Sequence, residues 1–169
     1  MLDIYTLGDE VLREPTEEIT EFDSALKMLV DAMFETLEEA DGIGLAGPQV
    51  GVSKRLFIVD LHQGEKGKYV FINPVITETS VEEGPYEEGC LSIPGLFHDV
   101  IRPLKVKCQA QDLNGKYFRV DADGILARVI QHENDHLYGT LYIDHLDPKS
   151  KEKMEKLYEK RQKRNSKRK

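Results

Sequence analysis

The sequence has no long apolar run and few cysteines. Its 169 residues include two cysteines and five histidines. No apolar run approaches the roughly 20 residues that a transmembrane helix needs. The first ten residues contain neither a basic region nor an apolar stretch, so we expect neither a membrane anchor nor a signal peptide. We therefore expect a cytoplasmic protein, whose thiols stay reduced and whose two cysteines need not form a pair.

The sequence also lacks internal repeats, low-complexity segments and a recognisable linker, so a single domain with a real core is the simplest expectation. Its net charge of −8 is unevenly distributed: residues 149–169 hold 11 Lys or Arg against 3 Asp or Glu, whereas the other 148 residues hold 12 against 28. We therefore divide the chain into one domain over residues 1–148 and a basic C-terminal helix and tail over residues 149–169. This basic segment is either a solvated helix end or a docking element for a polyanion such as RNA.

Apolar periodicity predicts three helices. Residues 23–40 show the i, i+3, i+4 spacing of an amphipathic helix, with Asp23 as its N-cap. A second helical pattern covers residues 124–137 and stops near Gly139. A third helix is expected after Pro148. Its apolar side contains Met154, Leu157 and Tyr158.

Short apolar runs between turn residues predict β-strands at residues 55–60, 69–73, 75–80 and 141–143. Alternation over residues 104–111 predicts a half-buried strand, which turns at Asn114-Gly115 and returns over residues 117–120. Cys108 falls on the apolar side of its strand, which favours a core residue over a metal ligand. The fold class that follows is α+β: antiparallel β-sheets around a central helix, with an N-terminal amphipathic helix and a C-terminal helix.

The central helix contains His132-Glu133-Asn134-Asp135-His136, which spells H-E-x-x-H. Histidines four residues apart project from one helical face and can converge on a single divalent metal. The glutamate between them is placed to act as a base on water activated by that metal, which indicates a hydrolase. The alternative is a solvated helix that carries two histidines by chance. Apolar neighbours predict that His132 is buried, where an unpaired imidazole would be costly.

A catalytic divalent site usually has three protein ligands and one open position, so one ligand is missing from this motif. Cys90 stands out because it follows Gly89 and lies on no periodic apolar face. A structural cysteine in a loop is the alternative interpretation. The other candidates are Cys108, His62, His98, His145 and the many carboxylates.

Residues 42–49 contain three glycines and a proline. This composition suits a tight turn or a backbone that approaches a ligand closely, although a plain helix-to-strand connection is equally open. A phosphate-binding loop is excluded because no Gly-Lys-Ser/Thr follows.

Together these segments make the chain resemble the bacterial peptide deformylases. The resemblance rests on three ordered motifs: Gly42-Ile-Gly-Leu-Ala-Gly-Pro-Gln49, Glu88-Gly-Cys-Leu-Ser92 and Gln131-His-Glu-Asn-Asp-His-Leu137. Gly47 departs from the family's alanine, and we expect little effect beyond added backbone freedom. An arginine that some members carry after the second motif is absent from Ile93-Pro-Gly-Leu-Phe97, which leaves the preference for later peptide residues open.

The resemblance implies a metal-dependent amidase, acting on linear amides, that removes the N-formyl group from the initiator methionine of new polypeptides and releases formate. It implies that Cys90, His132 and His136 bind one divalent metal. Glu133 would act as the base, and the side-chain amide of Gln49 and the backbone N–H of Leu91 would stabilise the oxyanion. The catalytic deformylase domain would then be residues 1–148.

The resemblance also implies a substrate site. The backbones of Gly44 and Gly89 would pair with the substrate as with an added strand. Ile43, Ile125 and Val129 are the residues expected around the methionine side chain. A tight space beside the metal would admit the formyl hydrogen and reject the larger acyl carbon of an ordinary peptide bond.

A cysteine with two histidines suits zinc, iron(II), cobalt or nickel. The resemblance implies Fe²⁺ in the cell, with Zn²⁺, Ni²⁺ or Co²⁺ as replacements in purified protein. The expected partners are nascent N-formylmethionyl polypeptides and, through the basic segment, the ribosome; neither DNA nor a membrane is expected. Two other functions stay open. One is a zinc peptidase, which the upstream cysteine ligand disfavours. The other is an inactive metal-stabilised module that binds ribosomal RNA, which the retained Glu133 disfavours.

Overall fold

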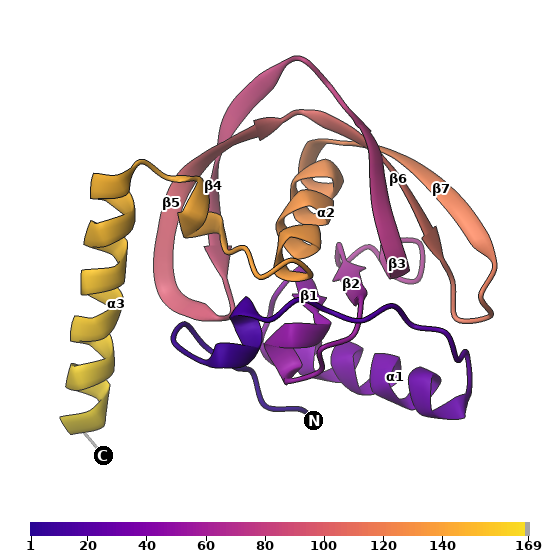
Figure 1. Ribbon diagram of the computed structural model, residues 1–169, viewed down its shortest axis with the longest axis horizontal. Coiled ribbons are helices and arrows are strands. Elements are labelled where there is room, and N and C mark those ends of the chain that lie inside the picture. Colours follow the sequence, from indigo (N-terminus) through magenta and orange to yellow (C-terminus); the bar gives the residue numbers. More distant parts are fainter. Residues whose placement is uncertain (168–169) are drawn as a thin grey trace.

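The computed structural model describes residues 1–167, and Figure 1 shows two sheets on either side of a central helix, α2. Arg168 and Lys169 of the expected tail lie outside the described residues. The α-helices are α1 (Ser24–Glu39), α2 (Gly124–His136) and α3 (Pro148–Lys167), and the 3-10 helices are η1 (Glu10–Arg13), η2 (Gly47–Val50) and η3 (Tyr142–His145). The strands are β1 (Gly44–Ala46), β2 (Leu56–Asp60), β3 (Lys68–Thr79), β4 (Glu83–Cys90), β5 (Ile93–Pro103), β6 (Lys105–Gln111) and β7 (Tyr117–Asp123).

All the strand pairs are antiparallel. Five strands form one sheet in the order β1-β2-β3-β6-β7, and β4 with β5 forms a second, two-stranded sheet. Helix α2 lies between the sheets, whereas α3 stands at the outer side of β5 (Figure 1). The predicted α+β class is therefore confirmed. Within residues 1–167, no helix combines the length and the apolar character needed to cross a bilayer.

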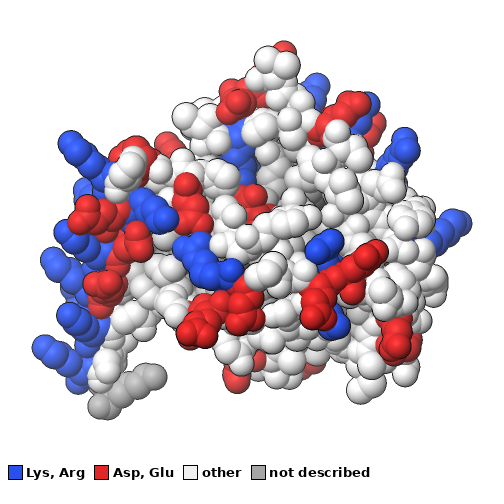
Figure 2. All heavy atoms as spheres, viewed as in Figure 1, with Lys and Arg blue, Asp and Glu red and all other residues white. Residues whose placement is uncertain are grey.

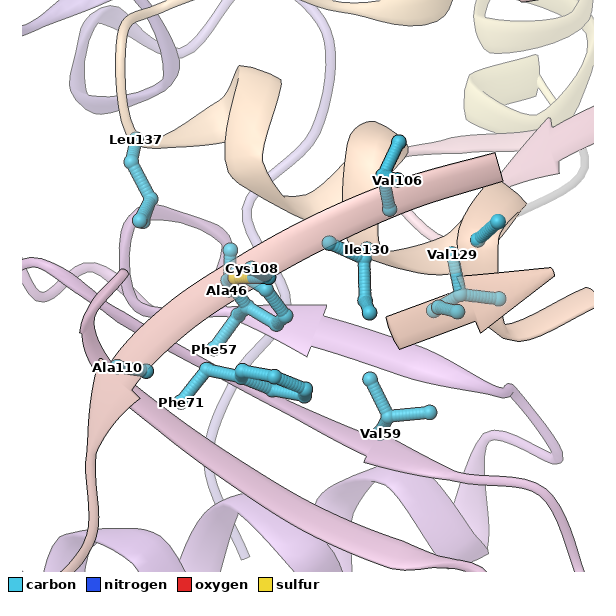
Figure 3. Close-up of a cluster of buried hydrophobic side chains, with 12 residues drawn as sticks. Ala46, Phe57, Val59, Phe71, Val106, Cys108, Ala110, Val129, Ile130 and Leu137 are labelled. Atoms are coloured by element: carbon cyan, nitrogen blue, oxygen red, sulfur yellow. The ribbon is translucent and has the colours of Figure 1, made fainter. Parts of the chain in front are cut away.

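The main core joins α2 to the five-stranded sheet. Figure 3 shows Ile130 of α2 pointing toward Phe57 and Phe71 of the sheet, and Val129 of α2 lying opposite Val59. The two phenylalanine rings stack with their centroids 4.7 Å apart. Cys108 is 1% exposed within this cluster, so its prediction as a core residue is confirmed. Burying these apolar side chains fixes α2, and with it the histidines, against the sheet.

The elements with clear periodicity form as predicted. Helix α1 begins after Asp23, whose carboxylate accepts a hydrogen bond from the N–H of Leu26 at 3.0 Å. Strands β6 and β7 form the predicted hairpin at Asn114-Gly115, and Gly115 takes a φ of 80° there.

Residues 69–73 and 75–80 were predicted as two strands, which is wrong because β3 runs through both. The pairing register with β6 shifts between Ile72 and Val75, where Asn73 has a φ of 51° and Pro74 has no N–H to donate. The side chain of Asn73 bonds to both backbone groups of Ile19, at 2.9 and 2.8 Å. A bulge therefore bends one long strand without ending it.

Two further predictions differ from the structure. Residues 141–143 were predicted as a strand, but η3 covers residues 142–145 because the Asp144 carboxylate caps the N–H of Leu141 at 2.9 Å. Leu157 was expected on the apolar side of the last helix, yet it is 39% exposed, while Met154 and Tyr158 are buried.

The β4–β5 hairpin was not predicted, because its first strand, Glu83–Cys90, is mostly charged residues and glycines.

An ion-pair cluster ties the N-terminal segment to η3. Asp144 accepts hydrogen bonds from Arg13 at 2.6 Å and from the N–H of Leu141, and it pairs with Lys151 at 2.9 Å. Burial alone would raise the pKa of Asp144, but these donors together lower it to about 2. The ionised carboxylate is therefore favoured by the folded state.

We expect Asp144→Asn to lower the free energy of unfolding at pH 7 by about 1–2 kcal/mol, a value reduced for the solvent exposure of Arg13. The folded pKa of about 2 lies below the unfolded value of about 3.9. The difference from wild type should therefore be complete above about pH 5 and vanish toward pH 2. Urea unfolding between pH 2 and 7 measures it, with exposed Asp3→Asn as the control. A difference that is independent of pH would contradict this assignment.

Candidate metal centre and substrate cavity

Three potential metal ligands from different parts of the chain converge beside α2. One ligand atom from each of Cys90, His132 and His136 lies within 4.8 Å of the other two. The Sγ of Cys90 is 3.4 Å from Nε2 of His136. Both histidines are buried, as predicted for His132, and the cysteine is half-buried. The i, i+4 spacing places both rings on one face of α2, and β4 delivers the sulfur to them.

Glycine at the end of β4 leaves room for a neighbouring ring. Gly89 pairs with Phe97, but Cys90 pairs with Ile93, so the register breaks between these two neighbours. A Cβ at Gly89 would lie 2.5 Å from the ring of Phe97, a distance that real side chains do not reach. The bare backbone at Gly89 therefore accommodates the ring of Phe97 where the register breaks before Cys90.

Glu88 orients the ring of His132. Its Oε1 accepts a hydrogen bond from Nδ1 of His132 at 2.9 Å, which leaves Nε2 facing the sulfur. Arg102 holds the same carboxylate through Nε at 2.7 Å and Nη2 at 3.0 Å. Burial would raise the pKa of Glu88, but the hydrogen bonds from His132 and Arg102 lower it to about 2, so it is an anion.

The roles of Glu88 and Arg102 were not predicted from the sequence. Glu88 occurs in the second motif, but nothing in the spacing marks it as a partner of His132. Arg102 has partners 14 and 33 residues away, Glu88 and Asp135. No local pattern could have indicated contacts over such separations.

The three groups fit a divalent cation. Burial would lower the pKa of His132, but hydrogen bonds with Cys90 and Glu88 raise it well above its ordinary value, so the pocket favours positive charge there. Burial, followed by the charge of His132, lowers the pKa of His136 well below its ordinary value, which keeps a lone pair free. A thiolate with two imidazoles suits zinc, iron(II), cobalt or nickel.

Glu133 lies beside this group with one oxygen free. Its Oε2 is 4.0 Å from Nε2 of His132, and its Oε1 is buried without a hydrogen-bond partner in residues 1–167. Burial raises the pKa of Glu133 to about 7. A Cβ at Gly44 would lie only 2.7 Å from Glu133 Oε2. The backbone of β1 and this carboxylate therefore approach each other as closely as glycine allows.

Gln49 is fixed by η2 with its amide directed at the sulfur. Its Oε1 accepts a hydrogen bond from the N–H of Ala46 at 2.9 Å. Its Nε2 lies 3.4 Å from Cys90 Sγ and 3.1 Å from Ser92 Oγ. Leu91 lies in the turn that follows Cys90, between β4 and β5.

Gly47 has a stricter role than the sequence indicated. A Cβ at this position would lie 2.8 Å from the carbonyl oxygens of both Val52 and Lys54. The expected effect of glycine was limited to added backbone freedom, but in this backbone an alanine would also force the following loop to shift.

A cavity of about 510 Å³ opens in front of the group. It is lined by all the residues that were proposed from the sequence to contact the substrate or the oxyanion, together with Cys90, His132 and Glu133. These are Ile43, Gly44, Gln49, Gly89, Leu91, Ile125 and Val129. Within the described chain, β1 and β4 are each edge strands, so the cavity lies beside two strand edges that have no partner. Tyr86, Phe97 and Arg128 also line it and were not predicted.

The other ligand candidates have different surroundings. His62 bonds to the carbonyl oxygen of Gly42, His98 to that of Asp99, and His145 to the Asp135 carboxylate. Burial raises the pKa of the Cys108 thiol to about 11, so it stays protonated in the core. In the part of the chain that the structure describes, only Cys90 joins the two motif histidines.

We expect Glu88→Gln to weaken the binding of a divalent metal by about 10–100-fold, because an uncharged amide orients the His132 ring less firmly. Competition with a chromophoric chelator measures the affinity, and thermal unfolding of the metal-free protein separates this effect from a loss of stability. Glu87→Gln, in the neighbouring exposed position, is the control. Equal affinities of Glu88→Gln and wild type would contradict the orienting role.

Known proteins are similar to this chain over most of its length. Residues 1–152 match the family model described as polypeptide deformylase. The chain is 46% identical over 151 residues to a peptide deformylase of Treponema pallidum (strain Nichols), which covers 89% of this chain and 91% of that protein. It is 51% identical over 137 residues to peptide deformylase 1 of Clostridium perfringens (strain 13 / Type A), which covers 81% and 92%.

Solved structures are also similar over nearly the whole chain. The crystal structure of a peptide deformylase from Legionella pneumophila superposes with a TM-score of 0.93 at 38% identity and covers 98% of both chains. The range matched by the family model includes Cys90, His132 and His136.

Proposed function

Because the chain belongs to the polypeptide deformylase family, whose members are amidases that remove the N-formyl group from nascent polypeptides, we propose that the cavity beside Cys90, His132 and His136 is the site of this reaction. The observation that carries the proposal is the free Oε1 of Glu133, which is buried next to the three converging ligand atoms. A purely structural metal site would need no such carboxylate.

We propose that Cys90, His132 and His136 hold one divalent metal. Fe²⁺ is the ion proposed in the cell, with Zn²⁺, Ni²⁺ or Co²⁺ as replacements in purified protein. When bound, such an ion acts as a Lewis acid that lowers the pKa of water and polarises a carbonyl group. Elemental analysis of protein purified without oxygen identifies the native ion.

Glu133 is the proposed base. It takes one proton of the attacking water as the oxygen adds to the formyl carbon. It then delivers this proton to the nitrogen as the carbon–nitrogen bond breaks, so formate and a free amino terminus leave. Its raised pKa of about 7 suits both halves of this transfer near neutral pH.

Gln49 and Leu91 are proposed to stabilise the oxyanion. The hydrogen bond from Ala46 anchors the carbonyl end of Gln49, so its amide group faces the sulfur and the cavity. The backbone N–H of Leu91 follows Cys90 directly in the chain. A donor of this kind typically contributes about 3 kcal/mol to the transition state.

The substrate backbone is proposed to lie between β1 and β4. Both edges are free to pair, and Gly44 and Gly89 have no side chain to block an added strand. Ile43, Ile125 and Val129 are proposed to contact the methionine side chain. The close approach of Gly44 to Glu133 leaves little space, which would favour the formyl hydrogen over a larger acyl carbon.

We expect Glu133→Ala to lower the rate of formate release from a formyl-methionyl peptide by about 10²–10⁴-fold, since the proton transfer is lost. The assay uses anaerobic iron-loaded or nickel-loaded protein, with bound metal quantified in each sample. Glu35→Ala, in an exposed position of α1 outside the cavity, serves as the control. Unchanged formate release by metal-loaded Glu133→Ala would disprove this role, and release of amino acids instead of formate would favour a peptidase.

We also propose that residues 1–148 are the catalytic unit and that the basic segment docks the enzyme on the ribosome near emerging chains. Figure 2 shows Lys and Arg gathered along the outer edge of the molecule, over α3. Only Met154 and Tyr158 of this helix are buried. The exposed Lys153, Lys160 and Arg164 lie on one face, away from these two side chains. Helix α3 therefore packs on the protein through one face and exposes these positive charges on another.

We expect replacement of Lys153, Lys160 and Arg164 by glutamine to weaken ribosome binding and to reduce its dependence on salt, since fewer phosphates would be neutralised. Activity on a free formyl peptide should be retained, because Met154 and Tyr158 still anchor the helix. The matched control replaces the exposed Lys27, Lys66 and Lys116 of the body by glutamine. Equal affinity and equal salt dependence of the two triple variants would refute the docking role.

A further inference from the structure

A line of polar side chains connects His132 to the protein surface. It begins at Glu88, whose Oε1 accepts the hydrogen bond from His132 Nδ1. It continues to Arg102, which binds both oxygens of Glu88. Arg102 then donates from Nη1 to Oδ2 of Asp135 at 2.9 Å. The same oxygen of Asp135 lies 2.8 Å from Nε2 of His145.

This line runs from buried to exposed groups and crosses four elements. The side chains of Glu88 and Arg102 are each 4% exposed, that of Asp135 is 24% exposed and that of His145 is 37% exposed. The members come from β4, β5, α2 and η3 in turn. His145 is thus the outermost residue of a connection that starts at a proposed metal ligand.

The charges along the line restrict the positions of the buried side chains, Glu88 and Arg102. Arg102 is almost fully buried between two carboxylates, those of Glu88 and Asp135. Arg128 adds a second guanidinium at 3.3 Å from Glu88. Two anions and two cations balance, so a displacement of Arg102 would leave a buried charge without its partner. The position of Asp135 therefore influences where Arg102 holds Glu88.

The 3-10 helix that carries His145 also contacts the metal centre directly. Tyr142, three residues earlier, stacks on the ring of His132 with centroids 5.9 Å apart and an interplanar angle of 24°. Its hydroxyl donates to the carbonyl oxygen of Leu96 at 3.2 Å. The bond between His145 and Asp135 joins η3 to α2 at the exposed end of the line.

We propose that His145 is a positioning residue for the metal centre. Its Nε2–H donates to Asp135 and holds that carboxylate against Arg102, so Glu88 keeps the ring of His132 in the orientation that presents Nε2. This inference rests on the proposed set of metal ligands. His145 itself touches neither substrate nor metal.

The test compares His145→Leu, which removes the donor, with His145→Gln, whose side-chain amide can restore an N–H near the position of Nε2. The probe is Co²⁺, whose affinity is measured by chelator competition and whose visible absorption reports ligand geometry. Partners in direct contact with a ligand change affinity by about 10–100-fold, so we expect about 3–10-fold weaker binding in His145→Leu, with an altered spectrum. His145→Gln should recover most of both.

His98→Leu is the matched control, because its ring contacts only the carbonyl of Asp99 among the described hydrogen bonds. It should leave affinity and spectrum unchanged. Thermal unfolding of each metal-free variant detects a general loss of stability. If His145→Leu does not fold, His145→Asn, which is too short to reach Asp135, takes its place.

The outcomes separate this inference from the proposed ligand set. If wild-type protein binds no Co²⁺, or if its spectrum lacks thiolate coordination, the ligand set itself fails. If wild type binds normally and His145→Leu matches it in affinity and spectrum, only the positioning role is overturned. The positioning role is also overturned if His145→Gln is as impaired as His145→Leu. The impairment would then not come from the lost hydrogen-bond donor.

Discussion

The carboxylate of Glu88 is the interaction on which the rest of this structure depends. It belongs to β4, yet its partners are Arg102 of β5 and His132 and Arg128 of α2. The two-stranded sheet pairs with no strand of the larger sheet, so this anion is a principal link between the hairpin and the helix. Its low pKa of about 2 keeps it charged, and a buried charge with three cationic or polar partners allows few alternative positions. The relative placement of Cys90 and His132 follows from that restriction.

The second constraint is that two positions of the cavity wall are glycines. Gly44 leaves space for Glu133, and Gly89 leaves space for the ring of Phe97. Both glycines lie on edge strands whose backbone groups face the cavity region. Reactive side chains and free backbone thus come together because two sheets end at the same place, one on each side of α2 (Figure 1).

The parts of the fold that could be predicted from the sequence depend on local patterns. Helical spacing identified α1 and α2, alternation identified β6, and the Asn114-Gly115 turn signal placed β7 after it. The H-E-x-x-H motif placed two histidines on one face. The β4–β5 hairpin escaped prediction because its strands are paired only with each other and carry charged, exposed residues. Arg102 and Asp135 escaped because their contacts join segments far apart in the chain. Cys90 was singled out by its setting after Gly89, but only the family resemblance implied its role as a ligand.

Unpaired strand edges have a further consequence for how this protein behaves in a concentrated solution. An edge that accepts one extended peptide can also accept a strand from another molecule and begin aggregation. Here β1 offers only three residues, which is too short for a stable intermolecular sheet. Strand β4 is longer but carries the exposed acidic residues Glu83 and Glu87, so two such edges would repel each other. The protein can therefore keep its edges open to an incoming chain end while discouraging contact with its own copies.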